Sequence, residues 1–155
     1  MSFIPATLCY IQSQDKTLML HRISAKEDLH YGKYNGLGGK IEPSESPEEC
    51  VIREVREESG LQISEPKLHG IITFPKFDGK NDWLVFVFTA DNFTGRLKQH
   101  TKEGKLEWID KNELYELHLW EGDYIFMKWL EGDRFFSAKF RYKKGKLEKY
   151  RVNFY

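Results

Sequence analysis

Residues 39–61, GKIEPSESPEECVIREVREESGL, constrain the fold of this chain more than any other stretch, because they predict a helix with a defined start and end. Ser46 suits the N-cap, Pro47 the first helical position, and Glu49 the position that completes a capping box. Gly60 suits the left-handed residue that follows a last helical turn. The sequence therefore predicts an α-helix between Ser46 and Gly60.

One face of this helix is acidic. Glu54, Glu57 and Glu58 are three and four positions apart, so they project from one side within roughly 100° of arc. Their repulsion weakens the helix, and a divalent cation that prefers oxygen ligands, such as Mg²⁺, would offset that cost. Composition alone favours a solvated acidic face instead. Arg53 is expected to pair with a carboxylate and orient it.

The spacing of this stretch resembles the Nudix box. The matching positions are Gly39, five residues, Glu45, seven residues, Arg53-Glu54-Val55, one residue, Glu57-Glu58, one residue and Gly60-Leu61. Residues 34–40, 120–123 and 135–155 are also similar to the MutT branch of the Nudix hydrolases. The resemblance implies an α/β fold, with an α/β/α sandwich around a central mixed β-sheet. It also implies hydrolysis of a nucleoside diphosphate linked to another group, with Mg²⁺ or Mn²⁺ as cofactor.

The length, composition and net charge of the chain limit how it can be organised. Its 155 residues predict one domain over residues 1–155, with 40% hydrophobic residues for a core. A net charge of zero gives no pull toward nucleic acid or an anionic membrane. We expect no stable nucleic acid complex, no membrane segment or signal peptide, and a monomer or weak homodimer. Cys9 and Cys50 lie in apolar segments, which predicts buried thiols without zinc and a cytoplasmic location.

Hydrophobic patterns and turn residues predict the other elements. β-hairpins are expected from residues 6–12 with 17–22, 68–74 with 83–90, and 135–142 with 147–154. A continuous apolar run in 83–90 predicts a strand buried on both faces. A short strand is expected at 105–109, helices at 111–117 and 123–130, and polar loops at 23–34 and 91–104. The glycine-rich residues 35–40 would allow close approach to a ligand, or simply form a turn.

The resemblance implies a metal site beside the acidic helix. Glu54, Glu57 and Glu58 match the metal-binding glutamates of the family, and the Gly38 carbonyl adds a ligand. Glu103 matches a further carboxylate that helps bind metal or activate water, although it could equally be a solvated loop acid. The predicted catalytic residues are Glu57, Glu58, Arg53 and Glu103. Which glutamate acts as the general base is left open among Glu57, Glu58 and Glu103.

The resemblance also implies a substrate site. Asn35 and Asp123 match positions that read a purine edge, whereas their structural alternatives are a turn residue and a helix N-cap. Trp120 either stacks on the base or belongs to the core, and Lys40 and Arg22 are candidate phosphate contacts. The mammalian relative has two adjacent aspartates where this chain has Gly122-Asp123. Two acids can share a proton, so a single one puts breadth across oxidised bases in doubt.

These features predict a Mg²⁺-dependent hydrolase of oxidised purine nucleoside triphosphates, which converts 8-oxo-dGTP into 8-oxo-dGMP and pyrophosphate and so cleans the nucleotide pool. The alternative with the same chemistry acts on ADP-ribose, a dinucleoside polyphosphate or an RNA 5′ end. Basic residues in 139–151 motivate the RNA version, although such residues also blunt an edge strand. A nucleotide-sensing module without turnover is disfavoured because the glutamates of the box are complete.

Overall fold

A strongly curved mixed sheet forms the centre of the molecule in a computed structural model that describes residues 2–155. Its strand order is β10-β9-β5-β6-β1-β2-β3, and β8 also pairs with β2. The strands are β1 (Phe3–Ser13), β2 (Lys16–Arg22), β3 (Tyr34–Asn35), β5 (Lys67–Phe74), β6 (Asp82–Ala90), β8 (Gly104–Asp110), β9 (Phe136–Lys143) and β10 (Lys146–Phe154). The β1–β6 and β5–β9 pairs are parallel and the others antiparallel, which confirms the mixed sheet.

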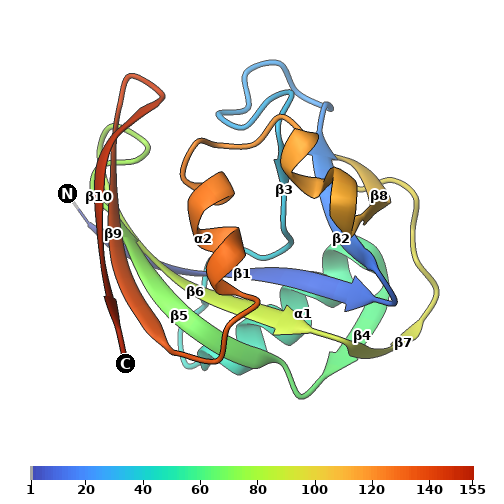
Figure 1. Ribbon diagram of the computed structural model, residues 1–155. Coiled ribbons are helices and arrows are strands. Elements are labelled where there is room, and N and C mark those ends of the chain that lie inside the picture. Colours follow the sequence, from blue (N-terminus) through green and yellow to red (C-terminus); the bar gives the residue numbers. More distant parts are fainter. Residues whose placement is uncertain (1) are drawn as a thin grey trace.

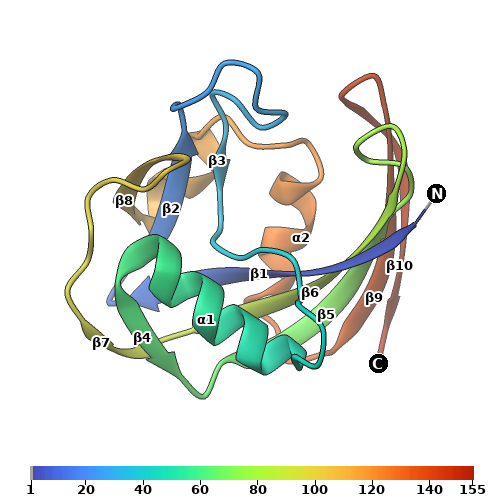
Figure 2. The same ribbon diagram turned by 180° about the vertical axis from the view of Figure 1, so that it is seen from behind.

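Helices cover both faces of this sheet. Helix α1 (Pro47–Ser59) lies on one face and α2 (Asp123–Trp129) on the other (Figures 1 and 2). Neighbouring residues of β6 pack on opposite faces of the sheet. Phe88 belongs to the core cluster that contains Val51 of α1, and Val87 belongs to the cluster that contains Phe126 of α2. This confirms the prediction that the apolar run forms a strand buried on both faces.

Helix α1 has the predicted ends. The Ser46 side chain accepts a hydrogen bond from the Glu49 backbone N–H at 3.1 Å, and the Glu49 carboxylate accepts one from the Ser46 N–H at 2.8 Å. Gly60 ends the helix with a left-handed φ of 82°. Both cysteines are free and buried, as expected. In the part of the chain that the structure describes, no helix is long and apolar enough to cross a membrane.

Four features differ from the prediction. The loop expected at 91–104 begins with a strand, β7 (Asn92–Gly95), which pairs with β4 (Leu61–Ser64) in a small second sheet. The helix expected at 111–117 is a 3₁₀ helix, Lys111–Glu116. The loop expected at 23–34 ends in β3, which also includes Asn35. The N-cap position of α2 is Gly122, so Asp123 is the first helical residue and makes no capping hydrogen bond.

The glycine-rich segment 35–40 fills a gap between β1 and β2. These two strands pair only beside their turn, from Ile11↔Leu18 to Ser13↔Lys16. Farther along, Leu37 exchanges two backbone hydrogen bonds with Cys9 of β1, at 2.6 and 2.9 Å. A Cβ on Gly38 would lie 2.0 Å from the Thr7 carbonyl oxygen, so only glycine permits this approach. The segment is thereby fixed to the sheet on one side and faces α1 on the other (Figure 2).

Candidate active site

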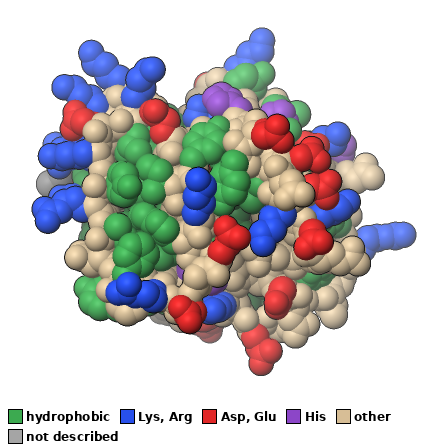
Figure 3. Space-filling view, viewed as in Figure 1, with side chains coloured by type: hydrophobic (Ala, Val, Ile, Leu, Met, Phe, Trp, Pro, Cys, Tyr) green, Lys and Arg blue, Asp and Glu red, His purple; other side chains and the backbone are tan. Residues whose placement is uncertain are grey.

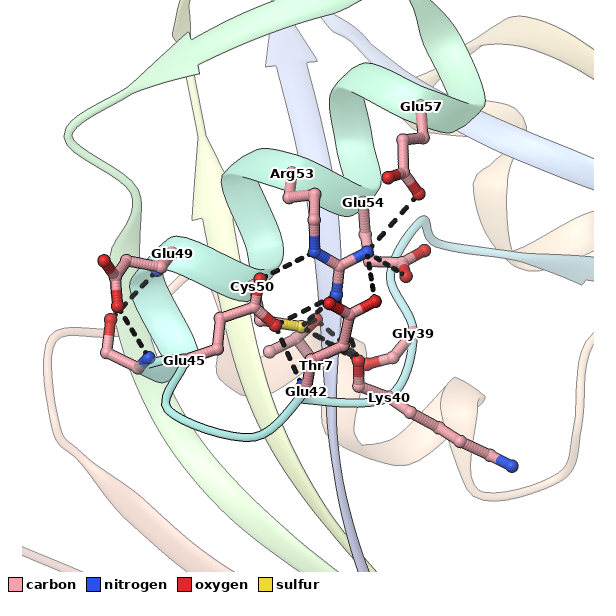
Figure 4. Close-up of polar contacts among 11 residues, drawn as sticks. Thr7, Gly39, Lys40, Glu42, Glu45, Glu49, Cys50, Arg53, Glu54 and Glu57 are labelled. Atoms are coloured by element: carbon pink, nitrogen blue, oxygen red, sulfur yellow. Dashed lines mark hydrogen bonds and ion pairs between the residues drawn. The ribbon is translucent and has the colours of Figure 1, made fainter.

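Arg53 organises the carboxylates at the surface of α1 (Figure 4). Its guanidinium donates to both Glu45 oxygens, at 2.6 and 2.9 Å, in the bidentate geometry that suits arginine. One of its terminal nitrogens also donates to Glu54 at 2.8 Å and to Glu57 at 3.3 Å. The hydrogen bonds from Arg53 lower the pKa of Glu45 to about 2. Arg53 therefore pairs with carboxylates, as the sequence predicts, and holds the helix against the segment that precedes it.

Glu54 and Glu58 lie closer to the interior. Burial raises the pKa of Glu58 to about 8, and the charges of Glu54 and Glu103 add to this effect, while the Gly38 N–H, which donates to Glu58 at 2.9 Å, opposes it. Burial also raises the pKa of Glu54, with further contributions from Glu57 and Glu103. A Cβ on Gly39 would lie 2.5 Å from the Glu54 carboxyl carbon, so this glycine makes room for the carboxylate.

Glu103 comes to the same region from the loop between β7 and β8. Its carboxylate accepts a hydrogen bond from the Thr101 hydroxyl at 3.2 Å, and that hydroxyl accepts from the Glu103 N–H at 3.0 Å. The side chain is half-buried, and its charge acts on both Glu54 and Glu58. The fold thus brings Glu103 close to the acidic face of α1, across about 45 residues of sequence.

The donor set of this acidic cluster, Glu54, Glu57, Glu58 and Glu103, suits a hard divalent cation, because carboxylate oxygens are the ligands that Mg²⁺ prefers. As the side chains stand, no three acidic, histidine or cysteine side chains within residues 2–155 converge on one point as metal ligands. Glu54 and Glu57 turn toward Arg53, and Glu58 turns toward the Gly38 N–H. The pKa values of Glu54 and Glu58 are raised first by burial and further by repulsion between the carboxylates, and a divalent charge would favour the ionised form of both, so the residues present fit the ion.

A cavity of about 350 Å³ adjoins the acidic cluster. Gly38 and Gly39 line this cavity and also contact the acidic cluster. The Gly38 N–H donates to Glu58, and Gly39 lies against the Glu54 carboxylate. All five residues that the sequence assigns to substrate binding line it: Arg22, Asn35, Lys40, Trp120 and Asp123. The structure therefore gathers residues from β2, β3, the glycine-rich segment and the start of α2 around one space of the size of a small ligand.

Two buried polar groups stand out in this cavity. Asn35 Oδ1 is buried and has no hydrogen-bond partner among residues 2–155. Asp123 is only 8% exposed, and burial raises the pKa of its carboxyl to about 8, although Lys33 opposes the shift. Because Asn35 belongs to β3 and Asp123 does not cap α2, neither structural alternative accounts for these residues. Buried polar groups of this kind normally have partners, so their arrangement suits a polar ligand.

The basic candidates already have protein partners. Arg22 Nε donates to Asp28 Oδ2 at 2.8 Å. The Lys40 ammonium lies over the Trp83 ring, 5.6 Å from its centroid. Either side chain would have to share these contacts in order to bind a phosphate.

Sequence reasoning missed several aromatic residues of the cavity. His30 and Phe77 come from loops, Trp83 from β6 and Tyr142 from β9. The Trp120 indole N–H donates to His30 Nδ1 at 2.7 Å, and the Trp120 ring centroid lies 4.8 Å from that of Phe77. For His30 and Phe77 the sequence offers one signal, namely large aromatic side chains in segments that are otherwise polar. It does not indicate that these segments meet.

Comparison with known proteins identifies the family. The NUDIX domain model matches residues 2–130. The chain belongs to the Nudix family. Nudix hydrolases generally use divalent metal ions, usually Mg²⁺, and act on small-molecule nucleotide substrates. The β9–β10 hairpin lies beyond the matched residues.

Relatives and solved structures agree with this assignment. The chain is 39% identical over 120 residues to the uncharacterized Nudix hydrolase YvcI of Bacillus subtilis, covering 76% of this chain and 72% of that one. It is 30% identical over 119 residues to the oxidized purine nucleoside triphosphate hydrolase of Danio rerio, covering 76% and 75%. The crystal structure of the MutT protein from Bacillus halodurans superposes with a TM-score of 0.86 at 34% identity, over 97% of both chains. Other similar Nudix proteins are named for ADP-ribose or NAD-capped RNA.

Proposed function

We propose that this Nudix hydrolase converts oxidised purine nucleoside triphosphates, 8-oxo-dGTP above all, into the nucleoside monophosphate and pyrophosphate. The observation that carries the proposal is that two unusual polar groups line one cavity: the buried Asn35 side-chain oxygen, which has no partner among residues 2–155, and the Asp123 carboxyl, whose pKa burial raises to about 8. An oxidised guanine carries a hydrogen on N7, which an unmodified guanine lacks. An acceptor that stays buried and unpaired penalises any base without that donor.

The acidic cluster supplies the other half of the proposed reaction. Glu54, Glu57, Glu58, Glu103 and the Gly38 carbonyl would hold Mg²⁺ or Mn²⁺, which when bound supplies positive charge to the phosphates. Water adds to the β-phosphorus, and the bond to the oxygen that bridges the α- and β-phosphorus breaks. The nucleoside monophosphate leaves with that oxygen, and a glutamate takes the proton of the water. Arg53 keeps the carboxylates of Glu54 and Glu57 oriented.

Lys40 and Arg22 stand where they can contact the phosphates, since both line the same cavity. We further propose that the protein acts on the free nucleotide in the cytoplasm, as a monomer or weak homodimer. Its two free, buried cysteines support a reducing compartment.

A second candidate substrate has a second group attached to the diphosphate, as in ADP-ribose or a dinucleoside polyphosphate. Trp83 favours it, because this ring gives the cavity a second indole in addition to Trp120. Lys40 covers Trp83 as a cation–π partner, and a second base or sugar would have to displace it. Basic side chains gather on the surface at the end of the β9–β10 hairpin (Figure 3), but none of them lines this cavity.

One panel of substrates separates these candidates. The purified protein is incubated with Mg²⁺ and 8-oxo-dGTP, dGTP, ADP-ribose, a dinucleoside polyphosphate or a 5′-triphosphorylated RNA, and the phosphate products are identified by ³¹P NMR. Pyrophosphate release that strongly favours 8-oxo-dGTP over dGTP supports the first candidate. Preferential cleavage of ADP-ribose or of the dinucleoside polyphosphate supports the second. Absence of turnover with every compound would contradict both.

Asp123→Ala provides a second test of base selection. We expect this variant to lose much of the preference for 8-oxo-dGTP over dGTP while its turnover of an unselective substrate changes little. Equal losses for both substrates would mean that Asp123 acts only on the stability of the cavity.

A further inference from the structure

His30 holds the indole of the cavity wall in place from a distant loop. Residues 23–33, which connect β2 to β3, carry it over the cavity, and the Trp120 indole N–H donates to its Nδ1 at 2.7 Å. These two residues are 90 positions apart in the sequence. The hydrogen bond therefore ties two surface segments together at the site where a base would bind.

The loop itself is fixed, which gives the His30 ring a defined position. Asp28 accepts from Arg22 Nε at 2.8 Å with one oxygen and from the His30 backbone N–H at 3.2 Å with the other. The His30 ring stacks on Phe77, with centroids 6.0 Å apart and planes inclined by 23°. These contacts therefore hold the loop and the His30 ring in place.

The ring is in the state that accepts this hydrogen bond. Because an indole N–H can only donate, His30 Nδ1 must be unprotonated and the ring proton must lie on Nε2. Burial lowers the pKa of His30 to about 4, and the charge of Arg22 acts in the same direction. The imidazole is therefore neutral at physiological pH, with a single tautomer selected by Trp120.

The other contacts of Trp120 fix its orientation less strictly. The Lys33 ammonium lies 4.7 Å from the centroid of the indole, and the Tyr142 ring meets it edge-on at 5.4 Å. Cation–π and edge contacts tolerate changes of several degrees in ring angle, whereas a hydrogen bond weakens steeply with misalignment. Trp120 is only 6% exposed, and without His30 its N–H would lose its protein partner.

We propose that His30 is a positioning residue for ligand selection, which sets the plane of Trp120 through the indole hydrogen bond. The inference rests on the proposed function, because Trp120 and Asp123 line the same cavity and the turn between them carries both. When the plane of the indole is set before binding, the ligand does not have to order it, and the affinity for a planar base rises. Loss of the hydrogen bond should therefore raise KM and leave kcat nearly unchanged.

A matched pair of variants tests the role of the acceptor. Asparagine and leucine have similar shapes. Only asparagine keeps a hydrogen-bond acceptor bonded to Cγ, its Oδ1, in the place of the His30 Nδ1. The indole N–H signals are recorded in ¹H–¹⁵N NMR spectra, with Trp120→Phe used to assign the Trp120 signal, and KM and kcat are measured for the preferred nucleotide. We expect His30→Leu to shift the Trp120 signal upfield and raise KM roughly tenfold, since one lost hydrogen bond is worth about 1.4 kcal/mol. His30→Asn should remain within about threefold of the original KM.

Each result decides one question. An unchanged Trp120 signal in His30→Leu, or equal KM values in the two variants, would overturn the positioning role. A fall in kcat as large as the rise in KM would also overturn it, because that result points to the reaction and not to ligand selection. Failure of the unmodified protein to hydrolyse any nucleotide would count against the proposed function instead, and the NMR signals of the same variants would still report whether His30 holds the indole.

Discussion

The acidic cluster and the aromatic cavity adjoin each other, but the protein builds them in opposite ways. Glu54, Glu57 and Glu58 of the cluster come from two turns of α1, and Arg53 beside them offsets part of their repulsion. The walls of the cavity come from many separate segments, and burial raises the pKa of one of its carboxyls, Asp123, to about 8. One region concentrates negative charge, and the other combines aromatic walls with a buried carboxyl.

This difference separates reaction from selection. A concentrated negative charge attracts a cation and can act on any diphosphate, whatever is attached to it. A largely aromatic cavity with buried polar groups distinguishes one base from another, because each buried polar group must find its partner. Changes in the two regions should therefore have different consequences: loss of rate in the first and loss of discrimination or altered stability in the second.

The largest expected effect is on the acidic cluster. Glu57→Gln removes one charge at an exposed position, so the fold should remain intact while kcat falls by roughly 10³-fold, the order expected when a charge that acts on the transition state is lost. The measurement is pyrophosphate release in the presence of Mg²⁺, with circular dichroism as the check on folding. Glu48→Gln, an exposed residue in the first turn of the same helix, serves as the matched control and should retain full activity. A Glu57→Gln enzyme with nearly full rate would refute the assignment of the cluster.

The cavity should respond to pH through Asp123. The folded-state pKa of about 8 lies above the ordinary value of 3.8, so the folded protein binds more protons than the unfolded chain between these values. The contribution of this carboxyl to stability is therefore greatest below pH ~4 and falls as the pH rises to ~8, by at most about 1.4 kcal/mol per unit.

Asp123→Asn removes this titration. We expect the variant to be more stable than the original protein at pH 8, by several kcal/mol and at most about 6 kcal/mol, and similar to it near pH 4, as measured by urea unfolding. The difference between the two unfolding curves isolates Asp123 from every other titrating group. If that difference does not change with pH, Asp123 is ionised in the folded protein and burial does not keep its carboxyl protonated.

Gly39 joins the two regions, and its replacement should affect both. In Gly39→Ala the new Cβ would lie 2.5 Å from the Glu54 carboxyl carbon, so either the carboxylate or the backbone must move. We expect a loss of about 1–3 kcal/mol in stability, which is typical of overpacking, together with lower activity on every substrate. Gly132→Ala is the control, because its Cβ would meet nothing closer than 3.6 Å. Equal melting temperatures for the two variants would show that the contact with Glu54 adapts without cost.

The smallest expected effect tests the scaffold alone. Ser46→Ala removes the side chain that accepts from the Glu49 N–H, and the loss of such a cap costs about 1 kcal/mol. Thermal unfolding should detect this loss, while substrate preference should not change. A shift in substrate preference would mean that the start of α1 communicates with the cavity, which the separation of the two regions does not predict.

The sequence predicts the acidic cluster better than the cavity for a physical reason. The capping box, the left-handed Gly60 and the helical spacing of Glu54, Glu57 and Glu58 are local signals within one segment, and the structure retains each of them. The three hairpins follow from patterns of similar range, whereas the mixed sheet is implied by the resemblance to the Nudix family.

What the sequence does not predict depends on contacts between distant segments. The short strands β4 and β7 pair only with each other, so neither has a strong signal of its own. His30 and Phe77 belong to polar loops that meet Trp120 only after the sheet has curved around the cavity. The preference of aspartate for helix N-caps suggested that role for Asp123, whereas burial beside the cavity places it one residue inside the helix.

The insertion of residues 35–40 between β1 and β2 has a consequence for dynamics. The amides of Cys9 and Leu37 bond to each other's carbonyl oxygens, so neither can open to solvent while β1 remains in place in the sheet. Both should exchange hydrogen with deuterium as slowly as the innermost strands, at rates set by global unfolding. A loop that contacts substrate usually exchanges quickly. Here the Leu37 amide, in the segment beside the cavity, should be among the last in the molecule to take up deuterium. Any adaptation to ligands would then occur in the surrounding loops.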